Sequence, residues 1–432
     1  MKELVYVLKS EAGLHARVAA LVAQCCVNLK SVVTVEANEK VADGSNVLQL
    51  LSLHANKGTE IVIKAEGGDE EAALEEVKAI FDMKEEEPLA NQALKIAFFG
   101  TKDYDKTFFN ELIKDKDAAA YNVEIRYYAV RLTEETVGMA EGYEAVCIFV
   151  NDEAPKIVIE KLHEMGIKLI LLRCAGFNNV NLQAARDCGM TVLRVPAYSP
   201  YAVAEHGMAI LQEANRRLHK AYTKVKENNF SLSGLMGLDL HNKVAGILGT
   251  GKIGQCMARI CKGYGMNVIA WDAYPNQALV EEGLLTYVEK EELFKKADMI
   301  SLHAPLIMGE GGTYHILNRE TMGMMKKTAM IVNTARGPLI DTEALIDYLE
   351  QGKFHAVAID VYEGEDSNVY TDRSDERLSN DVTARLQRFP NLVLTSHQAF
   401  FTREALQAIA VTTMENARNY MENKDYGPAL VK

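Results

Sequence analysis

Gly249-Thr250-Gly251-Lys252-Ile253-Gly254 is the stretch that decides the fold of most of this chain. It follows an apolar run, 244–248 (VAGIL), and opens a segment with apolar residues at helical spacing. In a strand–turn–helix unit the first glycine permits a tight turn, the second lets backbone approach a pyrophosphate, and the third allows close helix packing. The helix start adds N–H donors for phosphate. The segment therefore predicts a dinucleotide-binding βαβ unit.

An acidic residue follows at the spacing that a dinucleotide site needs. Asp272 ends the next apolar run, 18 residues after Gly254. A carboxylate there can accept hydrogen bonds from the adenosine ribose and would repel a 2′-phosphate, so NAD is favoured over NADP. The expected contacts to the cofactor in this unit are Gly249, Gly251, Lys252, Ile253, Gly254 and Asp272.

Strand-like and helix-like segments alternate on both sides of this motif. The predicted strands are 95–99, 145–150, 168–172, 244–248, 267–271, 299–302, 330–332, 356–359 and 392–395. Nearly continuous apolar strands of this kind are typical of parallel sheets covered on both faces. From residue 95 onward we therefore predict an α/β fold.

The first 84 residues have a different organisation. Short strands are predicted at 4–8, 32–35 and 61–63, with helices whose apolar faces are Val18, Leu21, Val22 and Cys25 in one and Ala73, Leu74, Val77 and Phe81 in the other. A charged, proline-containing stretch follows and predicts a linker at 85–94. We therefore expect a separate small α+β unit.

Composition excludes several classes of function. The 432 residues carry a formal charge of −13, and residues 1–90 alone hold −7. Surplus acid makes nucleic acid an unfavourable partner, and no apolar run approaches the ~18 residues of a membrane span. Seven cysteines without a Cys-x-x-Cys pair argue against a disulfide framework or a metal site, and Met1-Lys2-Glu3-Leu4 does not begin an export signal. We expect a cytoplasmic protein without metal.

Three further segments each end a predicted strand with polar residues, at the sheet edge where ligands bind. They contain Arg336, the pair Glu363 and Glu365, and His397. A 2-oxo acid reductase needs a cation for its substrate, a proton donor for the developing alkoxide, and a carboxylate that keeps the donor charged. Singly, each residue also fits a structural role, but Arg336, Glu365 and His397 after a nucleotide motif favour the reductase.

Residues 95–432 resemble the D-isomer-specific 2-hydroxyacid dehydrogenases, and more narrowly the fermentative D-lactate dehydrogenases of bacteria. The resemblance is carried by 101–106 (TKDYDK), 173–180 (RCAGFNNV), 195–198 (VPAY), 204–206 (AEH), 249–254 (GTGKIG), 332–337 (VNTARG), 360–363 (DVYE) and 396–400 (SHQAF). It implies an NAD-binding Rossmann domain, 197–396, inserted in a flavodoxin-like substrate domain made of 95–196 and 397–432.

The resemblance also implies a role for each site residue. Arg336 would hold and polarise the 2-oxo acid, and His397 would be the general acid paired with Glu365, which lies five residues after Asp360. Glu363 is expected to be solvated. Asp360 would lie near the nicotinamide carboxamide. The substrate carboxylate would meet backbone N–H groups around Ala175 and Gly176, with Tyr198 beside it.

The reaction implied is reduction of pyruvate to D-lactate by NADH, with a bulkier 2-oxo acid as the alternative substrate. Protonated His397 would be required, so reduction should fail as pH rises. We also expect a homo-oligomer.

In the N-terminal unit, Gly13-Leu14-His15-Ala16-Arg17 stands directly before the first predicted helix. A phosphoryl group on His15 would meet free N–H donors and the positive end of the helix dipole, with Arg17 as a charge partner. An exposed loop histidine is the simpler interpretation of these residues alone.

Residues 1–84 resemble HPr, the histidine phosphocarrier of the bacterial sugar phosphotransferase system, which is an α+β open sandwich. The matching segments are 13–17 (GLHAR), Ser45, 51–53 (LSL), 57–61 (KGTEI) and 68–72 (GDEEA). The resemblance implies that His15, assisted by Arg17, accepts phosphate from enzyme I, and that Ser45 occupies the regulatory kinase's position. Val18 stands where the family usually has proline, and the residues flanking Ser45 depart from the family pattern, which counts against kinase recognition.

Three functions follow for the whole chain. In the first, a D-lactate dehydrogenase is linked to sugar uptake through His15. In the second, residues 1–84 dock phosphotransferase proteins without accepting phosphate. In the third, the phosphocarrier is the main activity and the dehydrogenase half is inert.

Overall fold

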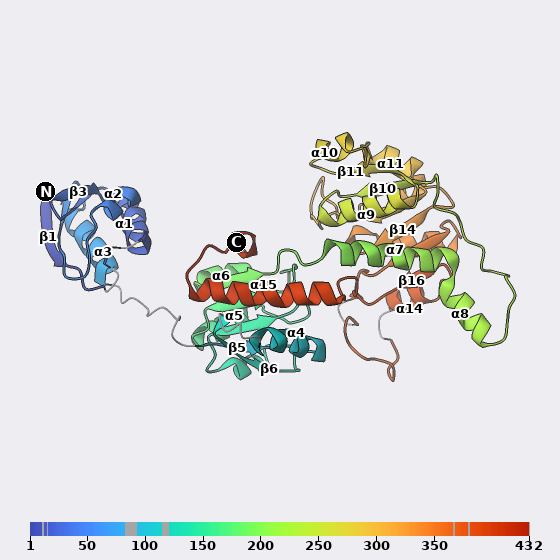
Figure 1. Cartoon of the computed structure of the whole chain (residues 1–432), viewed down its shortest axis with the longest axis horizontal. Helices are drawn as coiled ribbons and strands as arrows, with labels where there is room; N and C mark the ends of the chain where they lie inside the picture. Colours follow the sequence, from blue (N-terminus) through green and yellow to red (C-terminus); the bar gives the residue numbers. More distant parts are fainter. Residues whose placement is uncertain are drawn as a thin grey trace. The chain divides into compact units, whose positions relative to one another are not determined.

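The computed structural model describes residues 1–10, 13–14, 16–82, 93–114, 121–365, 368–378 and 381–431 (Figure 1). The chain divides into two compact units, Met1–Asn91 and Gln92–Lys432. Most of the predicted linker at 85–94 lies outside the described residues, and the described part resumes just before strand β5.

The first unit is an antiparallel four-stranded sheet with helices on one face. Its strands pair in the order β1-β4-β2-β3. Strand β4 alternates buried and more exposed residues, as expected when helices cover a single face. The predicted α+β open sandwich is therefore confirmed. Its elements are β1 (Lys2–Val7), α1 (Ala16–Asn28), β2 (Val32–Ala37), β3 (Lys40–Asp43), α2 (Val47–Ser52), β4 (Glu60–Glu66) and α3 (Glu70–Asp82).

Of the two buried helix faces predicted in this unit, one is confirmed and the other is wrong. Ala73, Leu74, Val77 and Phe81 of α3 are all buried, as predicted. In α1 the buried residues include Ala19, Val22, Ala23 and Cys26, so the predicted face was wrong by about one residue. Helix α1 is apolar around most of its circumference, and periodicity alone therefore does not fix which side meets the sheet.

The second unit contains two parallel sheets. The first has the strand order β6-β5-β7-β8-β9, the flavodoxin-like order. Its elements are β5 (Leu94–Phe98), α4 (Asp103–Lys114), β6 (Val123–Tyr127), η3 (Val137–Ala140), β7 (Ala145–Ile148), α5 (Lys156–Glu164), β8 (Leu169–Leu172), α6 (Leu182–Asp187) and β9 (Thr191–Arg194). Helix α15 (Arg403–Met421), from the end of the chain, packs on α4, β8 and β9 (Figure 1).

The second parallel sheet has the order β12-β11-β10-β13-β14-β15-β16. This is the Rossmann order with one more strand, so the predicted α/β architecture is confirmed. Its elements are α7 (Pro200–Arg216), α8 (Leu218–Lys226), β10 (Val244–Leu248), α9 (Lys252–Gly263), β11 (Asn267–Trp271), α10 (Gln277–Glu281), β12 (Thr286–Tyr287), α11 (Lys290–Lys296), β13 (Met299–Leu302), α12 (Arg319–Met324), β14 (Met330–Asn333), η4 (Gly337–Leu339), α13 (Thr342–Glu350), β15 (Ala356–Ile359), α14 (Asp381–Gln387) and β16 (Leu392–Leu394); a short helix, η6 (Gly427–Ala429), follows α15.

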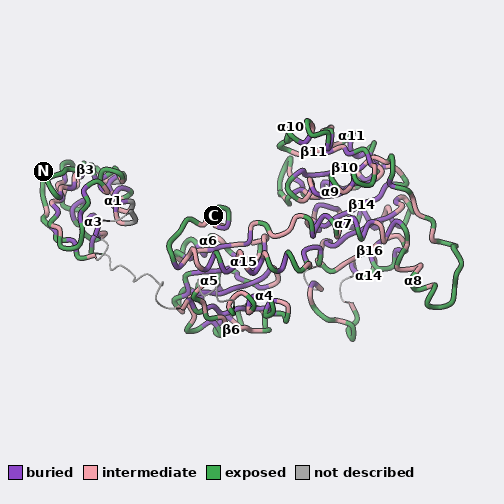
Figure 2. The backbone as a smooth tube through the Cα atoms, in the orientation of Figure 1, coloured by how far each residue is buried: buried purple, intermediate pink, exposed green. Residues whose placement is uncertain are grey.

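Four strands were not predicted: β3, β6, β9 and β12. Strand β6 lies at a sheet edge and has no fully buried residue, and β12 has only two residues, so neither has the continuous apolar run that marks the central strands. The two parallel sheets of the second unit are mostly buried, whereas α8 and the segment after it are largely exposed (Figure 2). Within the described ranges, no helix combines the length and apolar character needed to cross a membrane.

Candidate active site

The glycine turn between β10 and α9 has room for a phosphate group. Gly249 has φ +92, and a Cβ there would lie 2.6 Å from the backbone nitrogen of Ala304. A Cβ on Gly254 would lie 2.0 Å from the carbonyl oxygen of Gly249, so only glycine fits either position. A Cβ on Gly251, by contrast, would meet no described atom within 4 Å. The turn thus leaves open space in front of the helix start, as pyrophosphate binding requires.

Asp272 lies at the end of β11, beside this turn. Its Oδ2 accepts hydrogen bonds from the N–H (2.6 Å) and the hydroxyl (2.9 Å) of Thr250, and its Oδ1 accepts one from the N–H of Tyr274 (2.9 Å). The residue is only partly buried. The carboxylate is therefore held in place while remaining accessible to ribose hydroxyls, and the residues of this region fit NAD.

A cavity of about 510 Å³ lies near the ends of the strands of both parallel sheets. It is lined by all six of the predicted catalytic and substrate-binding residues, which come from segments far apart in the sequence. They are Ala175, Gly176, Tyr198, Arg336, Glu365 and His397.

His397 and Glu365 form the central pair of this cavity. The Nδ1 atom of His397 lies 3.0 Å from Oε1 of Glu365. The glutamate side chain is 12% exposed and its Oε2 accepts no hydrogen bond from a described residue, whereas the histidine side chain is 28% exposed. The carboxylate engages Nδ1, so Nε2 is the ring nitrogen that the pair leaves without this contact, in a cavity that both residues line.

Arg336 and Tyr198 line the same cavity. A Cβ on Gly176 would lie 3.6 Å from Nη2 of Arg336, so the guanidinium is next to the predicted substrate loop. Burial raises the pKa of Tyr198 to about 12, although Arg336 opposes the shift. The phenol therefore stays neutral at physiological pH and can donate a hydrogen bond.

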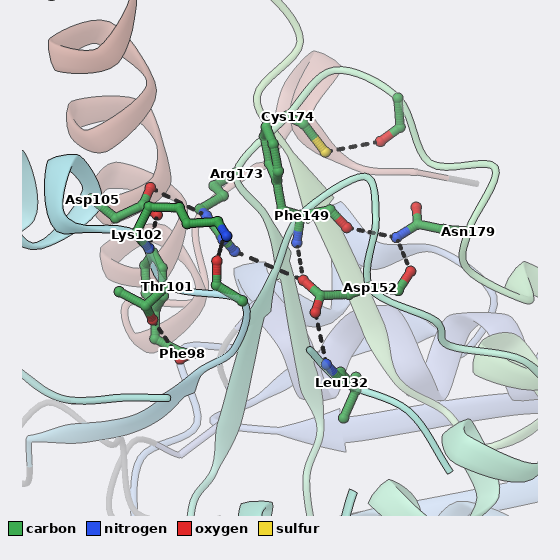
Figure 3. A network of polar contacts seen from close by, with 12 residues as sticks. Phe98, Thr101, Lys102, Asp105, Leu132, Phe149, Asp152, Arg173, Cys174 and Asn179 are labelled. Atoms are coloured by element: carbon green, nitrogen blue, oxygen red, sulfur yellow. Dashed lines mark hydrogen bonds and ion pairs between the residues drawn. The ribbon is translucent and has the colours of Figure 1, made fainter. Parts of the chain in front are cut away.

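A buried charge network lies beside this loop (Figure 3). Arg173 immediately follows β8; its Nη2 donates to the carbonyl of Gly100 (3.0 Å) and its Nε lies 3.4 Å from Asp105. Asp152 lies 4.0 Å from Arg173 and accepts the N–H of Phe149 at 2.6 Å. The network joins the segments that follow β5, β7 and β8, and so fixes the backbone from which the loop at 174–176 starts.

Asp360 lies outside the cavity lining and is fully buried. Its oxygens accept the hydroxyl of Thr395 (2.5 Å) and the N–H groups of Gln398 and Ala399 (both 2.9 Å). Burial alone would raise its pKa, but hydrogen bonds from His206, Thr395 and the two N–H groups lower the pKa below the ordinary value. In this structure the carboxylate orients the segment on either side of His397.

Glu363 is partly exposed and lines the cavity, but it is not a free solvated side chain, so the prediction that it would be one was wrong. Its Oε1 lies 2.7 Å from Nε2 of His315, and its Oε2 accepts the N–H of Thr342 at 3.1 Å. The side chain is 29% exposed. The reason lies in the tertiary structure, which brings the loop after β13 and the start of α13 against the turn after β15.

Two contact residues of the site were missed. His206 lies 3.1 Å from the hydroxyl of Thr395 and 3.4 Å from Asp360, and Tyr370 donates its hydroxyl to the carbonyl of His397 at 2.7 Å. His206 stands in the matching segment 204–206, which was a usable signal. Tyr370 lies in an irregular segment without a motif, so only the fold identifies it.

In the first unit, His15 lies outside the described residues, and the side chain of Arg17 is not described. Helix α1 begins at Ala16, directly after the predicted phosphorylation site, and the N–H of Leu14 donates to the carbonyl of Ala55 (2.8 Å). Ser45 is exposed and donates its hydroxyl to Asp43 at 2.7 Å. A phosphate on Ser45 would be repelled by that carboxylate.

Comparison with known proteins assigns both units. Residues 208–399 match the D-isomer specific 2-hydroxyacid dehydrogenase NAD-binding domain, and residues 2–82 match the PTS HPr component phosphorylation site. The chain is 47% identical to a 2-hydroxyacid dehydrogenase homolog of Haemophilus influenzae, over 75% of this chain and 95% of the relative. It is 45% identical to the D-lactate dehydrogenase of Escherichia coli, over 76% and 96%.

A solved structure described as the pyruvate reductase of Chlamydomonas reinhardtii superposes with a TM-score of 0.72 at 38% identity, covering 78% of this chain and 98% of that one. These matches agree with the strand orders of the two parallel sheets and with the glycine turn. The chain therefore belongs to the D-isomer specific 2-hydroxyacid dehydrogenase family, as an NAD-dependent enzyme with an HPr domain at its N-terminus.

Proposed function

We propose that the second unit reduces pyruvate to D-lactate. The observation that carries this proposal is the His397–Glu365 pair, 3.0 Å apart, lining one cavity together with Arg336. The printed names of two relatives, a D-lactate dehydrogenase and a pyruvate reductase, support the choice of substrate.

NADH, when bound at the glycine turn, supplies the hydride for C2 of the 2-oxo acid. Arg336 binds the carboxylate and polarises the carbonyl, while backbone N–H groups at Ala175 and Gly176 hold the other side of the carboxylate. Because Nδ1 of His397 is bonded to Glu365, its Nε2 is the atom that gives a proton to the substrate oxygen.

The pH dependence follows from this assignment. Reduction needs the imidazolium form of His397, so its rate falls as pH rises. Oxidation of D-lactate needs the neutral imidazole, so its rate rises over the same interval.

We also propose the domain boundaries that this chemistry implies. The substrate domain would comprise 95–196 and 397–432, and the nucleotide domain 197–396. The packing of α15 on α4 and β8 supports the return of the chain to the substrate domain.

Initial rates of NADH oxidation with pyruvate, 2-oxoisocaproate and glyoxylate test the substrate. We expect the highest kcat/KM with pyruvate, and NADPH to be a poor cofactor because Asp272 repels a 2′-phosphate. A preference for 2-oxoisocaproate would show that the enzyme acts on a bulkier 2-oxo acid than pyruvate. If none of the three 2-oxo acids is reduced, the proposal is overturned and the phosphocarrier is left as the main activity.

For the first unit we propose phosphorylation of His15 by enzyme I, which links the dehydrogenase to the sugar phosphotransferase system. The match of residues 2–82 to the HPr phosphorylation site supports it. The alternative is a docking module that binds phosphotransferase proteins without accepting phosphate.

Incubation with enzyme I and phosphoenolpyruvate, followed by intact-mass and peptide mass spectrometry, tests this role. We expect one phosphate on His15, absent from His15→Ala and retained in His54→Asn. His54 is the other histidine of this unit, and asparagine tolerates its φ of +46. An unphosphorylated chain that still binds enzyme I would instead identify a docking module.

We further propose a cytoplasmic homo-oligomer. Large apolar side chains are exposed on α8 and the segment after it, including Tyr222, Phe230, Leu232 and Met236. Contact with a second copy would cover them, and light scattering on the purified protein measures the mass.

A further inference from the structure

The backbone of His397 adopts an unusual conformation. Its φ is +49, in the left-handed region that residues with a Cβ rarely adopt. Such a conformation persists only where the surroundings determine it. His397 therefore needs contacts that hold its backbone while its imidazole bonds to Glu365.

Two hydrogen bonds hold that backbone, one on each side. The N–H of His397 donates to the carbonyl of Asp360 at 2.8 Å. On the other side, the hydroxyl of Tyr370 donates to the carbonyl of His397 at 2.7 Å. The first bond joins two neighbouring strand ends, whereas the second comes from a side chain that has no other assigned role.

Tyr370 is itself firmly placed. Its ring lies 5.7 Å from that of Phe149 and 6.3 Å from that of Phe400, and it lines the active-site cavity. Burial raises the pKa of Tyr370, so the phenol keeps its proton and remains a donor over the working pH range.

The same segment also contacts the carboxylate partner of His397. The N–H groups of Asn368 (2.8 Å) and Val369 (3.0 Å) both donate to the carbonyl of Glu365. Tyr370 follows directly. The stretch 368–370 thus forms hydrogen bonds with the backbone of both Glu365 and His397. The bond to His397 is the one that the Tyr370 hydroxyl donates.

We propose that Tyr370 is the positioning residue that holds the strained backbone of His397, and with it the alignment of His397 with Glu365. The inference rests on the proposed roles of this pair in 2-oxo acid reduction. Tyr370 acts through His397 and not on the substrate's reacting atoms.

The test compares Tyr370→Phe with Tyr348→Phe. The hydroxyl of Tyr348 also donates to a backbone carbonyl, that of Arg319, at 2.8 Å, but away from the cavity lining. The two variants therefore lose the same kind of hydrogen bond. We expect kcat for pyruvate reduction to fall about 5- to 10-fold in Tyr370→Phe, with KM nearly unchanged, and no such change in Tyr348→Phe.

The pH–rate profile separates positioning from a general structural role. Loosening the bond to Glu365 weakens support for the imidazolium, so the midpoint of the loss of reductase activity should move to lower pH in Tyr370→Phe. The other charged groups that line the cavity or contact the pair keep their side chains: Arg131, Asp152, Glu153, Arg173, His206, Arg336, Asp360, Glu363 and Glu365.

Wild-type turnover of at least one 2-oxo acid is measured first, because its absence would defeat the proposed function and not this inference. With an active wild type, an unchanged kcat and midpoint in Tyr370→Phe overturn the inference. An equal change in Tyr348→Phe does the same. NADH binding by fluorescence and the thermal midpoint verify that both variants are folded.

Discussion

Two histidine–glutamate pairs meet on one turn of this molecule, the turn after β15. Glu363 pairs with His315 at 2.7 Å, and two residues later Glu365 pairs with His397 at 3.0 Å. Both histidines have left-handed backbones, with φ +50 and +49. Distance and conformation therefore do not distinguish the pairs.

The remaining contacts of the two histidine–glutamate pairs do distinguish them. The second oxygen of Glu363 accepts the N–H of Thr342, and the ring of His315 stacks on Tyr314 at 3.8 Å. His397 lines the cavity, whereas His315 is not among the described residues that line it. The Glu363–His315 pair forms further contacts within the fold, so we expect it to stabilise the structure. His397 of the other pair lines the cavity, so we expect that pair to transfer a proton.

The largest expected contrast is between His397→Asn and His315→Asn. Asparagine tolerates the left-handed backbone of both positions, so each change removes mainly the imidazole. We expect kcat for the reduction to fall about 100- to 10,000-fold without the proton donor at 397, and less than about tenfold at 315. Steady-state assays measure both. Equal losses would show that the two pairs act alike.

A smaller contrast separates the glutamates. Glu365→Gln removes the charge that supports the imidazolium, and we expect kcat to fall about 10- to 100-fold, with reduction failing at lower pH than in the wild type. Glu363→Gln weakens the bond to His315 and to the start of α13, and should lower the free energy of unfolding by about 1 kcal/mol. Urea unfolding and the pH–rate profile measure the two effects. A larger kcat loss in Glu363→Gln would reverse the assignment.

The smallest effect concerns His303, a histidine without a carboxylate partner among the described residues. Burial lowers its pKa to about 4, from an ordinary 6.5, while its Nε2 lies 2.8 Å from the hydroxyl of Ser301. The unfolded chain takes up this proton below about pH 6.5 and the folded chain only near pH 4, so stability falls as pH decreases across that interval. His303→Gln should lessen the decrease in thermal midpoint between pH 6.5 and 4. An identical decrease in the thermal midpoint of variant and wild type would contradict this role of His303.

Much of the fold could be predicted because local patterns carry it. The apolar strands of both parallel sheets stand out since both of their faces are covered, whereas edge strands such as β6 and β12 lack that signal. The glycine turn was also predictable from a local pattern. The surroundings of Gly249 and Gly254 leave no room for a Cβ, so the sequence has glycine at both positions.

The site was predictable only in its parts. Arg336, Glu365 and His397 each end a strand segment, and their common sheet edge suggested that they meet. Glu363 could not be distinguished from a solvated loop residue, because its partner His315 lies 48 residues away along the chain. Tyr370 carries no motif at all, and its bond to His397 exists only because two loops pack together.

The sequence by itself determined the two-unit organisation and the nucleotide turn with Asp272, and it predicted a cation, a proton donor and a carboxylate near strand ends. These follow from short-range patterns, since a turn or a strand end is defined by neighbouring residues. Only the tertiary structure decided that Glu363 pairs with His315 and that the hydroxyl of Tyr370 donates to the carbonyl of His397. Those contacts join residues distant in sequence, and their strength depends on burial and on which polar atoms the fold leaves without a partner.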